Sequence, residues 1–256
     1  MSDSPVLFEV SDGIARVTLN RPDVGNAIDL PMARALVDAA IRCQTDQSIR
    51  CVVLTGAGRL FCAGGDVEAF RTAGSNVDAL LSELAGTLHM AVARFARMAK
   101  PFLVLVNGPA AGAGLSLAIS GDVVIAARSA HFTAAYGAIG LTPDGGMSWL
   151  LPRLVGLRKA QEMILTNRRM KSEEAGTSGL VTRVVDDEAL HEEGQATAAQ
   201  LAAAAVGAIG AARGLLRESL ESSLEVQLER EVATISRAGV LPEGREGLAA
   251  YFGKRP

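Results

Sequence analysis

The hydrophobic pattern alternates between strand-like and helix-like segments along the first 187 residues. Apolar and polar side chains alternate over Val6 to Val10 and Ile14 to Leu19, and the turn Ser11–Gly13 between them predicts a β-hairpin. Short apolar runs predict buried strands at 51–54, 102–106 and 123–126 and around Phe132. Helical spacing of apolar residues predicts helices at 31–41, 80–95, 113–120, 146–154 and 157–165. This alternation of strands and helices indicates an α/β fold.

The pattern changes after about Asp187, where strand signals end and helices rich in Ala, or patterned with Glu and Arg, continue to the C-terminus. We therefore expect two regions, a core at 1–187 and a helical lobe at 188–256 that packs on it. The uncharged stretch Gly194–Ala212 contains Gln and Gly residues, which favour a packed helix pair over a membrane span.

Composition excludes several classes of protein. Of the 256 residues, 49% are hydrophobic and 21% charged, which is enough apolar surface for a folded core. A net charge of −3 and an aromatic content of 4% argue against nucleic-acid binding, which favours excess Lys and Arg and stacking rings. Three His and three Cys, none at metal-ligand spacing, predict no metal site and reduced, buried thiols. The N-terminus lacks a basic region followed by an apolar core, so we expect a cytoplasmic protein without a membrane partner.

Two glycine-rich loops are candidates for binding an anionic oxygen. In Phe61–Asp66, Gly64 and Gly65 permit a sharp turn that leaves backbone N–H groups free, although a plain strand-to-helix turn capped by Asp66 is the alternative. The segment Asn107–Ala118 consists mostly of small residues and leads into a helix N-terminus, which attracts negative charge. Close helix–strand packing is its alternative explanation. Neither loop contains the Gly-Lys-Ser/Thr of a nucleotide phosphate loop.

Asp144 lies in a Thr-Pro-Asp-Gly-Gly turn directly before an apolar helical run. An aspartate at such a place often serves only as a turn or cap residue. A carboxylate held in an apolar loop is alternatively a competent general base or nucleophile.

These three segments, in this order, resemble the crotonase (enoyl-CoA hydratase/isomerase) superfamily. The resemblance covers nearly the whole chain and includes Leu19–Pro22, Asn26–Ala27, Val53–Gly56, Glu173–Ala175 and Gly179–Val181. It implies a ββα spiral core, a C-terminal helical trimerisation lobe, and assembly as a homotrimer or homohexamer. It also implies an acyl-CoA thioester as substrate, with coenzyme A carried by the substrate and no other cofactor.

By position, the resemblance places the two backbone donors to the thioester oxygen at Ala63 and Ala113. Removing a proton next to a thioester forms an enolate whose charge collects on that oxygen, and preorganised N–H groups stabilise it. The helix that starts near Ala113 adds its dipole in the same direction.

The sequence departs from the hydratase members of this superfamily, which use two catalytic glutamates. The corresponding positions hold Ser116 and Tyr136, and neither a hydroxyl nor a phenol replaces a carboxylate pair in activating water. Asp144 matches the single acid of isomerase-type members similar to those of phenylacetate catabolism. One base that carries a proton between C4 and C2 of an enoyl-CoA needs no second acid, so we expect an isomerase.

Two alternatives remain open at this point. Asp144 also matches the nucleophile of the 4-chlorobenzoyl-CoA dehalogenases, which place a histidine where His89 falls and an indole where Tyr136 falls. A nucleophilic acyl-CoA dehalogenase or hydrolase that uses Asp144 and His89 is therefore one alternative. His89 is alternatively a half-buried helix residue without a role, because it adjoins the apolar stripe of its helix. The missing glutamates are also compatible with an inactive binder of CoA esters.

The resemblance further implies contacts with coenzyme A at Arg21, Val24, Asp66 and Val67. Arg21 is a candidate phosphate ligand, or a solvated arginine at the end of the hairpin. Tyr251, Phe252 and Lys254 are expected to close on the nucleotide bound to a neighbouring subunit.

Overall fold

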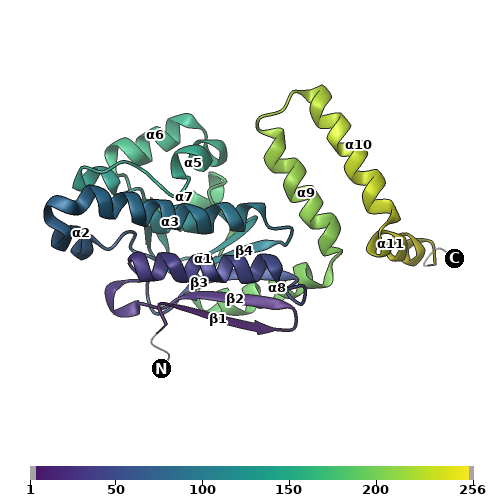
Figure 1. The fold of residues 1–256 in the computed structure, drawn as a ribbon, viewed down its shortest axis with the longest axis horizontal. Coiled ribbons are helices and arrows are strands. Elements are labelled where there is room, and N and C mark those ends of the chain that lie inside the picture. The colour runs from purple at the N-terminus through teal and green to yellow at the C-terminus, as the bar shows by residue number, and fades with distance from the viewer. Residues whose placement is uncertain (1–3, 254–256) are drawn as a thin grey trace.

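The computed structural model describes residues 4–253, so the predicted contact of Lys254 lies outside the described residues. Its main sheet has six strands, in the order β1 (Val6–Ser11), β2 (Ile14–Leu19), β3 (Cys51–Gly56), β4 (Phe102–Val106), β6 (Val123–Ala127) and β9 (Arg183–Val185). The β1–β2 pair is the antiparallel hairpin expected from the sequence, and the other pairs are parallel. Parallel strands need crossover connections, and helices supply most of them here (Figure 1).

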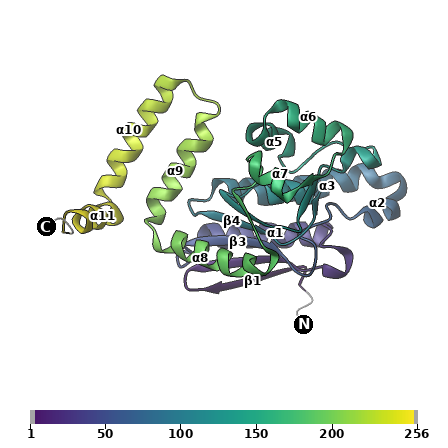
Figure 2. The same cartoon turned by 180° about the vertical axis from the view of Figure 1, so that it is seen from behind.

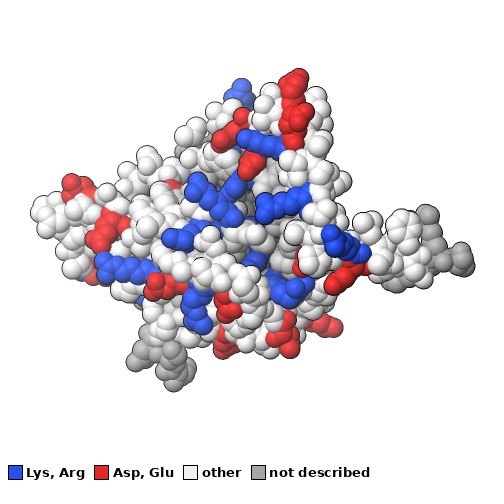
Figure 3. Space-filling view, turned by 45° about the vertical axis from the view of Figure 1, so that its right-hand side comes forward, with Lys and Arg blue, Asp and Glu red and all other residues white. Residues whose placement is uncertain are grey.

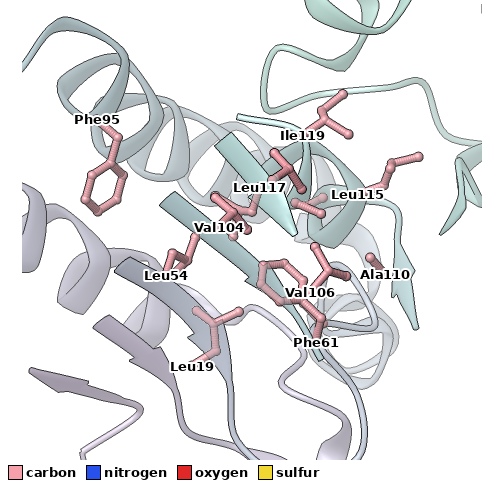
Figure 4. Close-up of a cluster of buried hydrophobic side chains, with 14 of the residues drawn as sticks. Leu19, Leu54, Phe61, Phe95, Val104, Val106, Ala110, Leu115, Leu117 and Ile119 are labelled. Carbon is pink, nitrogen blue, oxygen red and sulfur yellow. The ribbon is translucent and has the colours of Figure 1, made fainter. Parts of the chain in front are cut away.

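Both faces of this sheet are covered by helices. Successive side chains on a strand point to opposite faces, so neighbouring residues of one strand pack against different helices. On one face, Leu54 and Val104 pack with side chains of α1 (Leu30–Thr45) and α3 (Val77–Arg97). On the other face, Val53 and Leu103 pack against α8 (Leu190–Ala203). Figure 1 shows these helices on opposite sides of the sheet, and Figure 4 shows Leu54 and Val104 within the first cluster. The apolar runs of the central strands are thus buried on both sides.

A second layer of short elements lies beyond the main sheet. Three short strands form a small sheet in the order β5 (Ala110–Ala111), β7 (His131–Thr133) and β8 (Met170–Lys171). The helices that accompany them are α2 (Val67–Ala73), α4 (Ala113–Ala118), α5 (Met147–Val155), α6 (Leu157–Thr166) and α7 (Ser172–Thr177). The predicted α/β class is confirmed, and each strand and helix predicted before residue 187 is present.

Helices α9 (Val206–Ser219), α10 (Leu224–Val240) and α11 (Pro242–Gly253) extend away from the sheet (Figures 1 and 2). The division at residue 187 stays a prediction, since α8 lies on the sheet and the extended part starts with α9. Within residues 4–253, no single helix has the length and apolar composition to cross a membrane. One pair of helices, Asp187–Ala203 and Val206–Ser219, reaches the required length and apolar composition together, but the two are bent by 101° relative to each other.

Two arginines bind helix ends near the junction between the core and the extended helices. Arg213 of α9 donates to the backbone oxygens of Phe95 and Met98 at the end of α3 and pairs with Asp122 at 2.6 Å. Arg50 donates to the oxygens of Ala202 and Ala204 at the end of α8, at 2.5 and 2.8 Å. Figure 3 shows Lys and Arg side chains gathered where these helices meet the core. Each arginine satisfies carbonyl groups that a helix C-terminus leaves without partners.

The three cysteines are buried, and burial raises the pKa of each thiol to about 12. A raised thiol pKa keeps the group neutral at pH 8, and only the thiolate reacts with disulfide reagents. We therefore predict no labelling of the native protein by such a reagent at pH 8 and labelling of three thiols after unfolding in denaturant. Rapid labelling of one thiol in the native protein would contradict this burial.

Candidate functional site

A cavity of about 400 Å³ lies between α2, α3 and the two glycine-rich loops. Its wall is mostly apolar, and Asp144 is the one acid among the described residues that line it. Apolar side chains come from Ile28, Val67, Phe70, Leu81, Leu84, Ala85, Leu88, Ile139 and Leu141. A concave, largely apolar space with few polar groups is the usual form of a small-molecule site.

Two of the predicted site residues, Asp144 and Tyr136, line this cavity and contact each other. The phenol of Tyr136 donates to Oδ1 of Asp144 at 2.5 Å. Burial, followed by the nearby Asp144 carboxylate, raises the pKa of Tyr136 far above its usual value. The phenol therefore stays protonated and acts as a donor, while no described residue donates to Oδ2 of Asp144.

The turn that carries Asp144 is held by two further side chains. Ser116 of α4 donates its hydroxyl to the backbone oxygen of Asp144 at 2.9 Å, and Met147 N–H donates to the same oxygen at 3.1 Å. The N–H of Gly145 donates to Nε2 of His89 at 3.0 Å. His89 is exposed on α3 and does not line the cavity, so the structure brings it to the backbone beside Asp144 and not to the carboxylate.

Of the two backbone N–H donors predicted in the glycine-rich loops, the structure leaves one without an acceptor and pairs the other within the chain. Ala113 begins α4, and its N–H has no acceptor among the described residues. The N–H of Ala63 donates to Gly25 O at 2.9 Å and is therefore not available to a ligand, so its assignment as a donor was wrong. Two residues later, the N–H of Gly65 has no acceptor in the described chain, and Gly65 lines the cavity.

Sequence reasoning missed Gly65 because the acceptor of Ala63 lies 38 residues away, at Gly25. Residues 28 and 65 form a single β-bridge in which Ile28 binds the neighbours of Gly65 on both sides. Only the N–H of Gly65 itself is left pointing away from this bridge. The expectation for Asp66 as an N-cap is confirmed, since its carboxylate accepts from Glu68 N–H and Ala69 N–H.

The predicted coenzyme A contacts lie next to the cavity. Val67 lines the cavity, while Arg21, Val24 and Asp66 line an adjoining open groove. Arg21 is engaged within the chain, because it pairs with Asp29 at 3.3 Å and with Asp66 at 3.1 Å. Contact with a phosphate therefore stays a prediction.

The remaining candidates lie elsewhere. Tyr251 and Phe252 lie on α11, and neither lines the cavity. No group of three or more His, Cys, Asp or Glu side chains in residues 4–253 is arranged to hold a metal ion.

The sequence model of the enoyl-CoA hydratase/isomerase family matches residues 9–256. The chain belongs to this family. A 1,2-epoxyphenylacetyl-CoA isomerase of Escherichia coli is 38% identical over 98% of this chain and 96% of its own length. A 4-chlorobenzoyl coenzyme A dehalogenase-2 of an Arthrobacter species is 33% identical over 99% of this chain and 92% of its own length.

Solved structures agree with this assignment. The crystal structure of an enoyl-CoA hydratase from Polaromonas sp. JS666 has a TM-score of 0.93 and 32% identity, over 98% of this chain and 97% of that chain. The crotonase-like fold predicted from the motifs is thus confirmed. Members of the enoyl-CoA hydratase/isomerase family act on acyl-CoA thioesters, and the relatives differ in the reaction that their names state.

The close contact between the two glycine-rich loops yields a testable prediction. A Cβ at Gly114 would lie 2.3 Å from the backbone oxygen of Cys62, so Gly114→Ala must push α4 away from Cys62. We expect a loss of about 1–3 kcal/mol in the free energy of unfolding, measured by denaturant titration. Gly86→Ala is the control, because a Cβ at Gly86 in α3 meets nothing within 4 Å and alanine favours helix. Equal stability of the two variants would contradict the close contact.

Proposed function

We propose that this chain is an acyl-CoA isomerase that converts a 3-enoyl-CoA to a 2-enoyl-CoA, with Asp144 as the general base. The observation that carries the proposal is the arrangement of the cavity wall. One carboxylate, with Oδ2 free of donors, shares the cavity with Gly65 and Ala113, whose N–H groups have no acceptor in the described chain. Enolate chemistry requires a base that removes a proton and hydrogen-bond donors that stabilise the negative charge on the thioester oxygen.

In the proposed reaction, the thioester oxygen accepts hydrogen bonds from the N–H groups of Gly65 and Ala113. Asp144 removes a proton from C2, and the electrons move into a dienolate whose charge lies largely on that oxygen. The protonated Asp144 then returns the proton to C4, which leaves the double bond between C2 and C3. Each backbone donor contributes about 2.7–4 kcal/mol to such a transition state in other enzymes. The cycle is redox-neutral, and the proposal includes no cofactor besides the coenzyme A of the substrate.

The neighbours of Asp144 favour isomerisation over hydration. Hydration needs groups that both activate a water molecule and deliver a proton to carbon. Ser116 and Tyr136 lie where the resemblance places the hydratase glutamates. Their hydroxyls donate to Asp144, that of Ser116 to the backbone oxygen and that of Tyr136 to Oδ1. The cavity then has a single acid for proton transfer, which suffices for moving one proton between two carbons of the same substrate.

The acyl group in this proposal is hydrophobic. The side chains of α2 and α3 that line the cavity are apolar, and no Lys or Arg among the described residues lines it to pair with a second carboxylate. The isomerase relative from Escherichia coli acts, by its name, on a phenylacetyl-CoA derivative. We accordingly place the substrate among enoyl-CoA esters of aliphatic or aromatic acids without further charge.

Replacing the base tests the proposal directly. We expect Asp144→Asn to lower kcat for 3-enoyl-CoA isomerisation by about 10²–10⁴-fold, because the amide does not accept the proton. Binding of a CoA ester, measured by calorimetry, should persist, since the cavity wall and backbone donors are unchanged. An Asp144→Asn variant that isomerises at the parent rate would refute the role of Asp144.

Nucleophilic catalysis is the second candidate, since a 4-chlorobenzoyl coenzyme A dehalogenase is among the relatives. It requires attack of Asp144 on the substrate and an ester intermediate on the enzyme. Rapid quenching during turnover of 4-chlorobenzoyl-CoA, followed by mass spectrometry, distinguishes the two. The isomerase proposal expects no adduct, a nucleophilic Asp144 produces one, and binding without turnover of any ester indicates an inactive binder.

We also propose that the chain forms a homotrimer, or a dimer of trimers, through α9–α11. Large apolar side chains are exposed on these helices, among them Leu216, Leu224, Val232 and Ile235 at 60–73% of their full exposure. Apolar surface of this extent on one part of a chain favours association.

The oligomer is tested by light scattering coupled to size-exclusion chromatography. The parent chain should run at three or six times the monomer mass of 26.6 kDa. Ile235→Asp should shift the mass towards the monomer, while Val10→Asp, an exposed apolar position on β1, should leave it unchanged. A monomeric parent chain at micromolar concentration would refute the assembly.

A further inference from the structure

The peptide unit between Asp144 and Gly145 has both of its polar groups held by side chains from two different helices. Its oxygen accepts from the Ser116 hydroxyl of α4 at 2.9 Å. Its N–H donates to Nε2 of His89 on α3 at 3.0 Å. A rotation of this peptide would break both hydrogen bonds, so its plane is fixed.

The turn is also pressed against α4. Gly145 is buried with φ +61°, and a Cβ there would lie 2.8 Å from Cβ of Ser116. Glycine adopts this left-handed conformation without strain, and no other residue fits the space. The direction of the Asp144 side chain is therefore set at its backbone, and Tyr136 then fixes one of the two carboxylate oxygens.

The hydrogen bond to Gly145 also determines which ring nitrogen of His89 acts as the acceptor. A backbone N–H only donates, so Nε2 must be the acceptor and carries no proton. A neutral imidazole with an unprotonated Nε2 carries its proton on Nδ1. The ring nitrogen that faces the site thus has its lone pair engaged by the backbone beside Asp144.

We infer that His89 is a positioning residue, which as the Nδ1–H imidazole holds the Asp144–Gly145 peptide and thereby aims Oδ2 of Asp144 into the cavity. This inference rests on the proposed function of Asp144 as the base. It assigns no proton transfer to His89, which lines no part of the cavity and presents no free lone pair towards it. Ser116 holds the other side of the same peptide.

Kinetics of two variants test the positioning role. His89→Ala removes the acceptor, and we expect kcat to fall by about tenfold, the usual effect of one lost hydrogen bond, with KM within about twofold. His89→Gln places an amide oxygen near the position of Nε2, and it should recover most of the lost kcat. The matched control is His191→Gln on α8, which should leave both constants unchanged.

Equal and severe loss of kcat in His89→Ala and His89→Gln would overturn the inference, because it would mean that His89 transfers a proton. Unchanged kcat in His89→Ala would overturn it as well. Circular dichroism and thermal unfolding of each variant separate these results from misfolding, and the exposed place of His89 makes misfolding a minor effect.

Nitrogen-15 NMR gives a readout that does not depend on turnover. The chain has three histidines, and the signal of His89 is the one that His89→Gln removes. It should show a ring whose Nε2 carries no proton and whose Nδ1 carries one. A proton on Nε2 would overturn the inference. If Asp144→Asn isomerises normally, the proposed function fails, whereas this measurement still reports whether the Gly145 contact exists.

Discussion

The site depends on two backbone segments that lie against each other with no side chain between them. Ala111 N–H donates to Cys62 O at 2.9 Å, and Cys62 N–H donates to Pro109 O at 3.3 Å. The start of α4 then passes so close to Cys62 that only glycine fits at position 114. Because of this contact, Gly65 and Ala113, whose N–H groups have no acceptor in the described chain, line one cavity although they are 48 residues apart in sequence. The rest of the site is built around this pair.

The side chains that bind Asp144 from α4 and from the loop before it carry hydroxyl groups and no further carboxylate. Two nearby carboxylates repel each other and compete for protons. Ser116 and Tyr136 are neutral, and each directs a hydrogen bond towards Asp144. The negative charge in the cavity is therefore confined to one residue, with one oxygen occupied by a donor and the other available. This arrangement suits a reaction in which one proton leaves and rejoins the same molecule.

Much of the fold could be predicted from the sequence, because periodicity reports local structure. The buried runs at 51–54 and 102–106 and the helical stripe at 80–95 correspond to β3, β4 and α3. The two-residue strands β5 and β8 were not predicted, since so short a segment carries no periodic signal.

The site was predicted in part, for a similar reason. Asp144, Tyr136 and Ala113 were found from motifs, whereas the choice between Ala63 and Gly65 depends on a bond to Gly25 that no local pattern encodes. The hydrogen bond between His89 and Gly145 joins residues 56 positions apart, so no local pattern predicts it either.

The joint between the core and α9–α11 has a consequence for the order of folding. Arg213 of α9 binds carbonyl oxygens that are arranged as acceptors only after the end of α3 has formed. The extended helices therefore acquire their direction from helix ends in the finished core, and not from an apolar core of their own. A nascent chain can complete its cavity first and orient its C-terminal helices last, so the apolar side chains exposed on these helices are brought into position only after the core has folded.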